Sequence, residues 1–210
     1  MPRPPRPLCC GRTFLSVGLV EEARAEARRL LAAAKPLIEA GIPIVGLEPS
    51  CLLTLRDEFV SLLPGSDAER LASHALLLEE FLAREAKAGR VSGPIGVRAD
   101  KLLLHGHCHQ KAFGAMGAVE QTLALVSGLT VETVASSCCG MAGAFGYAAE
   151  THDVSLAMGE LSLLPTLRQA PPRTVIAADG FSCRHQIRDG TGREALHVAR
   201  VLRDAMRAGR

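Results

Sequence analysis

Hydrophobic positions recur with helical spacing in the first part of the chain. Over residues 19–40 leucine and alanine return every three or four positions, with glutamate and arginine between them. This spacing predicts an amphipathic helix that ends at Gly41, with Pro36 kinking or shortening its last turn. The apolar run over residues 42–47 then predicts a short buried strand.

Later segments alternate between helical and strand-like patterns. A second helix is expected over residues 67–87, where Ser66 and Glu69 have the spacing of a capping box. The glycine-rich segment 88–100 predicts a linker. Strands are then expected at 101–105, 129–135 and 173–178, and helices near 117–127, 152–169 and 193–208. This alternation predicts an α/β fold with small parallel sheets flanked by helices and right-handed crossovers.

One order of motifs occurs twice. The tripeptide Cys-Cys-Gly is followed by a predicted strand, a Ser-Cys pair and an aliphatic-Arg-Asp tripeptide, at 9–11, 50–51 and 55–57 and again at 138–140, 182–183 and 187–189. The spacing from the pair to the single cysteine is 41 residues in the first copy (51 − 10) and 44 in the second (183 − 139). We therefore predict two pseudo-repeated lobes: residues 1–90, a first repeat truncated at its N-terminus, and residues 91–210, a complete second repeat.

Composition narrows the class of protein. The 210 residues carry a net charge of +2 and only 3% aromatic residues, so neither a basic face nor stacking aromatics indicate nucleic-acid binding. The seven cysteines are an odd number, and the N-terminus lacks the apolar core of an export signal. We therefore expect a cytoplasmic protein, or one peripheral at the inner face of the membrane, whose cysteines bind metal or carry redox chemistry.

Five of the cysteines follow predicted strands, where ligands of parallel sheets gather: Cys51, Cys108, Cys138, Cys139 and Cys183. Adjacent cysteines suit a single zinc ion poorly, whereas they can reach different irons of a multi-iron cluster. A glycine after each pair permits close approach of the backbone. Buried core cysteines, a vicinal disulfide switch and a structural metal site remain alternatives. His105, His107 and His109 flank Cys108, and one of them is expected to hydrogen-bond a cluster sulfur.

The motifs also resemble a known family. "HCHQK" (107–111), "SCCGMAGAFGY" (137–147) and "GFSCR" (180–184) resemble the cysteine-rich CCG domain found in heterodisulfide reductase and in the iron–sulfur subunit of glycolate oxidase. Together with "CCGRTFLSVG" and "GLEPSCLLTLRDEF", they are most similar to the C-terminal part of long FAD-linked oxidases. The likeness runs from Leu8 to the end of the chain, and it implies a piece of a larger oxidase.

The resemblance implies metal ligands and partners. The ligands would be Cys108, Cys138, Cys139 and Cys183 in the second repeat and Cys9, Cys10 and Cys51 in the first. Where heterodisulfide reductase has the earlier cysteine of a C-x-x-C pair, this chain has Glu48 and Gly180. The family implies an iron–sulfur cluster of the 4Fe-4S type on this chain and FAD on a partner domain or subunit. It also implies electron transfer for a 2-hydroxy acid dehydrogenase, with a membrane quinone as one acceptor; a heterodisulfide reductase-like activity is the alternative.

Overall fold

A computed structural model describes residues 7–91, 94–96 and 101–208. The chain divides into two compact units, Met1–Leu77 and Leu78–Arg210, which we call unit 1 and unit 2. The predicted linker over residues 88–100 falls inside unit 2, and its residues 92–93 and 97–100 lie outside the described part. Within the described residues, no helix has both the length and the apolar character needed to cross a membrane.

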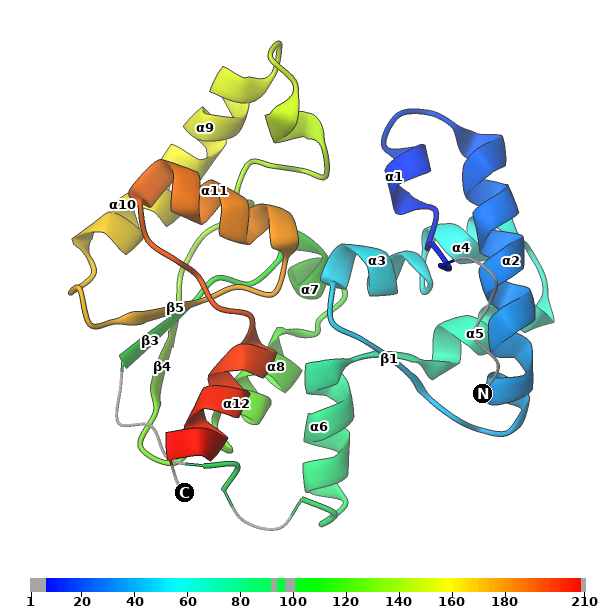
Figure 1. Ribbon diagram of the computed structural model, residues 1–210, viewed down its shortest axis with the longest axis horizontal. Helices are drawn as coiled ribbons and strands as arrows, with labels where there is room; N and C mark the ends of the chain where they lie inside the picture. The colour runs from blue at the N-terminus through cyan, green and yellow to red at the C-terminus, as the bar shows by residue number, and fades with distance from the viewer. Residues whose placement is uncertain (1–6, 92–93, 97–100, 209–210) are drawn as a thin grey trace. The chain divides into compact units, whose positions relative to one another are not determined.

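Unit 1 is mainly helical around a two-stranded parallel sheet (Figure 1). Its elements in chain order are α1 (Arg12–Leu15), α2 (Val20–Glu39), β1 (Ile44–Gly46), α3 (Pro49–Thr54), α4 (Glu58–Leu62), α5 (Ser66–His74) and β2 (Ala75–Leu77). The predicted first helix is α2, and the predicted strand is β1. Alanines at the buried positions of α2 let neighbouring backbone approach closely.

The prediction of one continuous helix over residues 67–87 is wrong for residues 75–77. Residues 75–77 form β2, which pairs in parallel with β1, with Ile44 opposite Ala75. Helical periodicity continues through this apolar stretch, but tertiary pairing with β1 overrides it. The expected capping box is also not formed, because Gly65 is the N-cap of α5 and offers no side chain to accept from the first turn.

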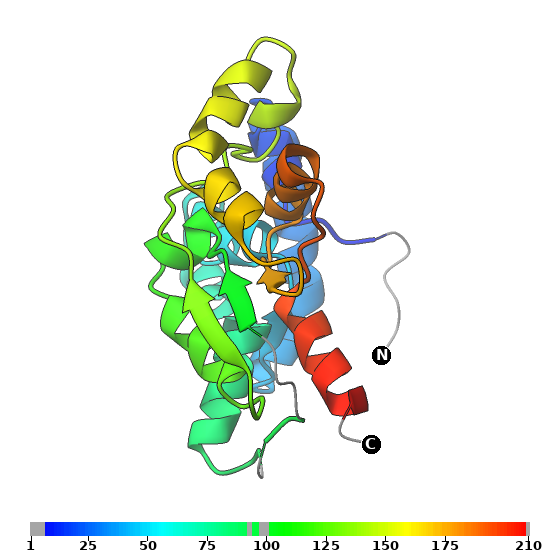
Figure 2. The ribbon, with the colours of Figure 1, turned by 90° about the vertical axis from the view of Figure 1, so that its left-hand side faces the viewer.

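Unit 2 is a three-layer α/β/α arrangement. Its elements are α6 (Leu78–Lys87), β3 (Lys101–Leu104), α7 (Cys108–Ala112), α8 (Met116–Leu123), β4 (Thr130–Thr133), the 3₁₀ turn η1 (Phe145–Tyr147), α9 (His152–Glu160), α10 (Leu163–Gln169), β5 (Val175–Ala177), α11 (Phe181–Thr191) and α12 (Val198–Ala208). The parallel strands lie in the order β4-β3-β5. Figure 2 shows this sheet with helices to either side. The α/β class with small parallel sheets is confirmed.

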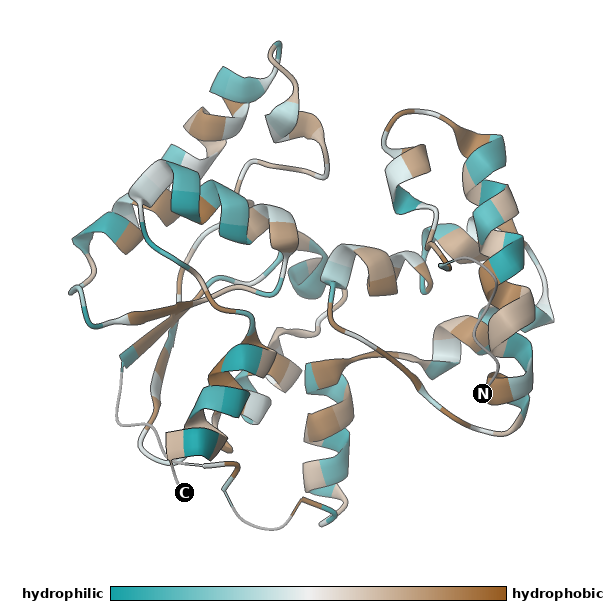
Figure 3. Ribbon diagram, in the orientation of Figure 1, coloured by the Kyte–Doolittle hydropathy of each residue, from teal (hydrophilic) through white to brown (hydrophobic). Residues whose placement is uncertain are grey.

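Alternating strand residues pack into two hydrophobic cores of unit 2, one on each face of the sheet. Leu103 and Ile176 pack with residues of α10 and α11 on one face of the sheet. Leu102 and Leu104 pack with residues of α8 and α12 on the other. Because successive strand side chains point to opposite faces, β3 and β5 contribute to both cores. Residues 102–104 of β3 and all of β5 are accordingly hydrophobic, whereas β4 is mostly polar and α12 is hydrophobic on one side only (Figure 3).

Two predicted helices of unit 2 are shorter than expected. The helix expected over residues 152–169 is divided into α9 and α10, because Pro165 has no N–H to continue the hydrogen-bond ladder and is placed in the first turn of α10. The helix expected from residue 193 begins only at Val198. Leu196 is instead extended and joins β5, where its carbonyl accepts from the amide of Ala178 at 2.9 Å.

Each Cys-Cys pair ends in a glycine with left-handed backbone. Gly11 has φ 83° and Gly140 has φ 98°. A Cβ on Gly11 would lie 3.0 Å from the Ala23 carbonyl oxygen in α2, and a Cβ on Gly140 would lie 2.0 Å from the Ser155 carbonyl oxygen in α9. Only glycine has both the conformation and the size for these turns.

We predict that Gly140→Ala lowers the free energy of unfolding by at least about 2 kcal/mol, since the left-handed conformation and the clash with Ser155 act together. Urea unfolding of the full chain measures this. Gly117→Ala in α8 is the control, because its Cβ would meet nothing closer than 4.0 Å and alanine favours a helix over glycine by up to about 1 kcal/mol. Equal losses in the two variants would contradict the assignment.

A buried polar network lies between α6, α7 and α12. Asp179 accepts hydrogen bonds from Gln110 Nε2 at 2.8 Å and from the backbone amide of Val198 at 3.0 Å. Glu79 is 1% exposed, and neither of its carboxylate oxygens has a hydrogen-bond partner among the described residues. Burial, together with repulsion from the Asp179 carboxylate, raises the pKa of Glu79 to about 8. Glu79 therefore enters the folded state as a neutral acid at pH 7.

Glu79 should make stability depend on pH. The unfolded chain releases this proton near pH 4.5, whereas the folded chain holds it until about pH 8. The contribution of Glu79 to folding free energy thus becomes less favourable as pH rises through this window and is constant above it. We expect the melting temperature of Glu79→Gln, relative to the parent, to increase from pH 5 to pH 8 and then level off. The exposed Glu150→Gln should show a difference that does not vary with pH.

Candidate metal centre

Four cysteines of unit 2 follow the three parallel strands at one edge of the sheet. Cys108 is the first residue of α7, four positions after β3 ends. Cys138 and Cys139 lie in the loop after β4, and Cys183 lies in the first turn of α11, after β5. The carboxyl ends of parallel strands meet at one edge, so the topology brings these thiols together. Cysteines at the carboxyl ends of strands were expected from the sequence, and this arrangement is confirmed.

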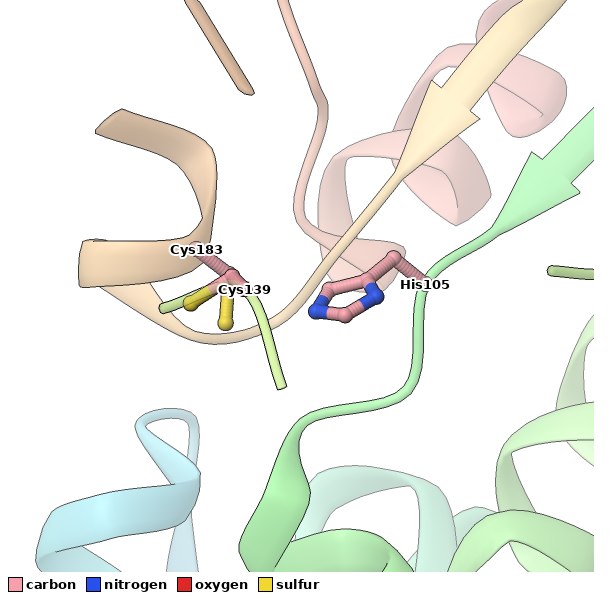
Figure 4. Close-up of side chains that lie close together, drawn as sticks. All are labelled: His105, Cys139 and Cys183. Carbon is pink, nitrogen blue, oxygen red and sulfur yellow. The ribbon is translucent and has the colours of Figure 1, made fainter. Parts of the chain in front are cut away.

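The four sulfurs form a continuous chain of contacts. The Cys138 side chain is hydrogen-bonded to those of Cys108 and Cys139, and Cys139 is hydrogen-bonded in turn to Cys183. The sulfurs of Cys139 and Cys183 and a ring nitrogen of His105 all lie within 4.8 Å of one another. Figure 4 shows His105 directed toward the two sulfurs from the segment that follows β3.

The thiols differ in their readiness to ionise. Hydrogen bonds from Cys108 and Cys139 hold the pKa of Cys138 far below its usual value. The pKa of Cys183 is likewise lowered, chiefly by a hydrogen bond from the Cys139 thiol, although burial opposes ionisation. The donors, Cys108 and Cys139, have raised pKa values because they supply these hydrogen bonds. Metal binding requires thiolates, and the lowered pKa values of Cys138 and Cys183 favour the thiolate form at two of the four positions.

Two helix N-termini and a lysine add positive potential. Cys108 and Cys183 each stand in the first turn of a helix, where free N–H groups and the dipole favour negative charge. Lys111 Nζ donates to the Ser137 carbonyl oxygen at 2.9 Å and also to that of Ser136. Burial lowers the pKa of Lys111, and the charge of the four cysteines opposes this change. The sequence patterns did not single out Lys111, although it follows Cys108 by three positions on the same helix.

The histidines near Cys108 have separate roles. His105 is 1% exposed; its Nδ1 lies 3.0 Å from Ser136 Oγ, and its Nε2 has no hydrogen-bond partner among the described residues. His107 is the N-cap of α7, and its Nδ1 accepts from the amide of His109 at 3.1 Å. The helix begins at Cys108, so His105 and His107 precede it and His109 lies within it. Of these three histidines, His105 is the one that forms a group of potential metal ligands with the cysteines in the described part of the chain.

Unit 1 brings together the other three cysteines. The amide of Gly11 lies 3.4 Å from Cys9 Sγ, just as the amide of Gly140 lies 3.3 Å from Cys138 Sγ. The Cys51 thiol hydrogen-bonds to Cys10 and lowers the pKa of Cys10 to about 6, while the pKa of Cys51 is raised. All three thiols line one cavity of about 390 Å³.

These donor sets fit an iron–sulfur cluster. All seven cysteines are free, and each unit gathers its own thiols beside the left-handed glycine of a Cys-Cys-Gly turn. Multi-iron clusters are held by just such sets of thiolates, with backbone amides directed at sulfur. Where a cluster is bound, Cys108, Cys138, Cys139 and Cys183 would hold it in unit 2, and Cys9, Cys10 and Cys51 would hold it in unit 1.

Known proteins are similar to this chain in sequence. The chain is 32% identical over 168 residues to D-2-hydroxyglutarate dehydrogenase of Escherichia coli (strain K12), an alignment that covers 79% of this chain and 16% of that protein. It is 27% identical over 201 residues to one subunit of the anaerobic glycerol-3-phosphate dehydrogenase of the same organism, covering 94% of this chain and 49% of that subunit. The chain thus spans about a sixth of the first relative and half of the second.

A family match falls on the four-cysteine site itself. Residues 102–188 match the family described as the cysteine-rich domain, CCG. This segment runs from β3 into α11 and contains Cys108, Cys138, Cys139 and Cys183. The part of the chain from residue 102 to residue 188 therefore belongs to the CCG cysteine-rich domain family.

Proposed function

We propose that the chain is the iron–sulfur electron-transfer module of an FAD-linked dehydrogenase that oxidises a 2-hydroxy acid. The observation that carries this proposal is the convergence of four thiols, from three strand ends, at one edge of the unit 2 sheet. The relatives are named as dehydrogenases of 2-hydroxyglutarate and of glycerol 3-phosphate. Both reactions that these names describe are oxidations at a hydroxyl-bearing carbon.

A thiolate-bound cluster, most simply of the 4Fe-4S type, supplies one-electron chemistry when bound. Oxidation of a hydroxy acid by hydride removal is chemistry that a flavin performs and a thiolate-bound cluster does not. The chain carries no G-x-G-x-x-G fingerprint, so we assign FAD to a partner domain or subunit. The chain's own residues would orient the thiolates and offset their charge through Lys111 and the first turns of α7 and α11.

We also propose that the two units arose by duplication, with a first repeat ending near residue 90. Several features support equivalence: a Cys-Cys-Gly turn against a helix, and a strand leading to a helix whose first turn holds a cysteine. In addition, β1 pairs in parallel with β2 before α6, just as β5 pairs with Leu196 before α12.

For the module as a whole we propose a cytoplasmic position and electron delivery to a quinone-type acceptor.

The first test concerns the metal. The anaerobically reconstituted chain should be brown and contain iron and acid-labile sulfide in similar amounts. Cys138→Ser should remove more of this content than Cys9→Ser, because four thiols converge in unit 2 and three in unit 1. Val154→Ser, at an exposed position, is the control. A colourless protein that binds stoichiometric zinc without sulfide would contradict the proposal.

The second test concerns electron flow. We expect the isolated chain not to oxidise lactate, glycolate or 2-hydroxyglutarate with artificial acceptors. Stopped-flow mixing with photoreduced FAD should bleach the cluster absorbance, and a water-soluble quinone should restore it; Cys138→Ser should lose most of this signal. If the cluster stays oxidised while the chain, supplied with reduced viologen, reduces a small disulfide, the heterodisulfide reductase-like function replaces the electron-relay function.

A further inference from the structure

The cavity that holds the three thiols of unit 1 contains one charged side chain. Five leucines and Gly46 form most of its lining, together with Cys9, Cys10 and Cys51. The remaining lining residue is Glu48. Glu48 is half-buried, and its carboxylate is a second type of anionic donor beside the three thiols of this cavity.

The backbone places Glu48 beside Cys51. Glu48 is the N-cap residue of α3, three positions before Cys51, and its extended backbone (φ −94°, ψ 113°) begins the turn that carries the thiol. An N-cap side chain often accepts from the amides of the first turn, but the Glu48 side chain makes no such bond. Its Oε1 accepts instead from Ser50 Oγ at 2.7 Å, so the hydroxyl of the second residue of α3 orients the carboxylate. The Glu48 charge also raises the pKa of Cys51, after larger effects from Cys10 and burial, so the two groups are close.

Unit 2 shows the complementary arrangement. The residue three positions before Cys183 is Gly180, again the N-cap of its helix and again extended. A Cβ there would lie 2.3 Å from the His107 ring and 3.0 Å from Cys183 Sγ, so no ligand side chain fits. Unit 2 gathers its fourth donor from Cys108 instead. Each unit thus presents four potential ligands: four thiols in unit 2, and three thiols with one carboxylate in unit 1.

We propose that Glu48 is the fourth protein ligand of the iron–sulfur cluster that unit 1 holds through Cys9, Cys10 and Cys51, an inference that rests on the function proposed above. A carboxylate oxygen is a harder donor than a thiolate and binds the iron of a cluster less firmly. One iron of the unit 1 cluster would therefore be more exchangeable than the others. Ser50 would act as a positioning residue through its hydrogen bond to Oε1.

The test uses the full chain carrying Cys138→Ser, in which the unit 2 site is disabled, after anaerobic reconstitution with iron and sulfide. Adding Glu48→Gln should lower bound iron by about a quarter at nearly constant sulfide, since one iron of a four-iron cluster loses its ligand. After one-electron oxidation of the same sample with ferricyanide, the electron paramagnetic resonance signal of an oxidised three-iron cluster should appear. Glu48→Cys should restore the iron and remove that signal. Glu22→Gln, at an exposed position of α2, is the matched control.

The outcomes separate this inference from the proposed function. Unchanged iron and an unchanged spectrum in Glu48→Gln would overturn the role of Glu48 and indicate solvent, or a donor from outside this chain, at the fourth position. If the Cys138→Ser background binds no iron while the chain with all seven cysteines does, unit 1 holds no cluster, which overturns the inference and leaves the proposed function intact. If the chain with all seven cysteines binds no iron or sulfide, the proposed function itself fails.

Discussion

The structure of unit 2 depends on holding four cysteine sulfurs in a continuous chain of contacts, although sulfurs that ionise repel one another. Their proximity lowers some pKa values and raises others, so that donors and acceptors alternate along the chain of sulfurs. The four sulfurs do not hold one another in place, so the backbone must fix their positions. A parallel sheet does so, because its strand ends meet at one edge and the following helices direct their N-termini toward the same place.

Close packing of backbone against backbone then fixes the Cys-Cys pairs. Gly140 brings the second turn against Ser155 of α9, and Gly11 brings the first against Ala23 of α2. A larger residue at either position would move both cysteines of the pair together. The glycine is thus as much a part of the metal centre as the thiols, even though it offers no ligand atom.

Buried polar groups support the loops that carry Cys108 and Cys183. Gln110 joins the two loops: its Oε1 accepts from the amide of His107, and its Nε2 donates to Asp179. Asp179 in turn accepts from the first turn of α12, and a neutral Glu79 lies within 4.8 Å of it. Such networks orient metal-binding loops, and their disruption would be expected to loosen the site without removing a ligand.

The sequence alone predicted the α/β class, helix α2, the strands of unit 2 and the grouping of the cysteines, because these depend on local periodicity and on residue types with few alternative uses. It did not predict that residues 75–77 form a strand, since their apolar pattern suits a helix equally well and only pairing with β1 decides between them. Nor could it select His105 from three histidines or find Lys111, because their positions follow from the turn into α7 and from the loop after β4. The role inferred for Glu48 likewise required the cavity of unit 1, because only folding brings residues 9–10 and 48–51 to one place and exposes a carboxylate to three thiols.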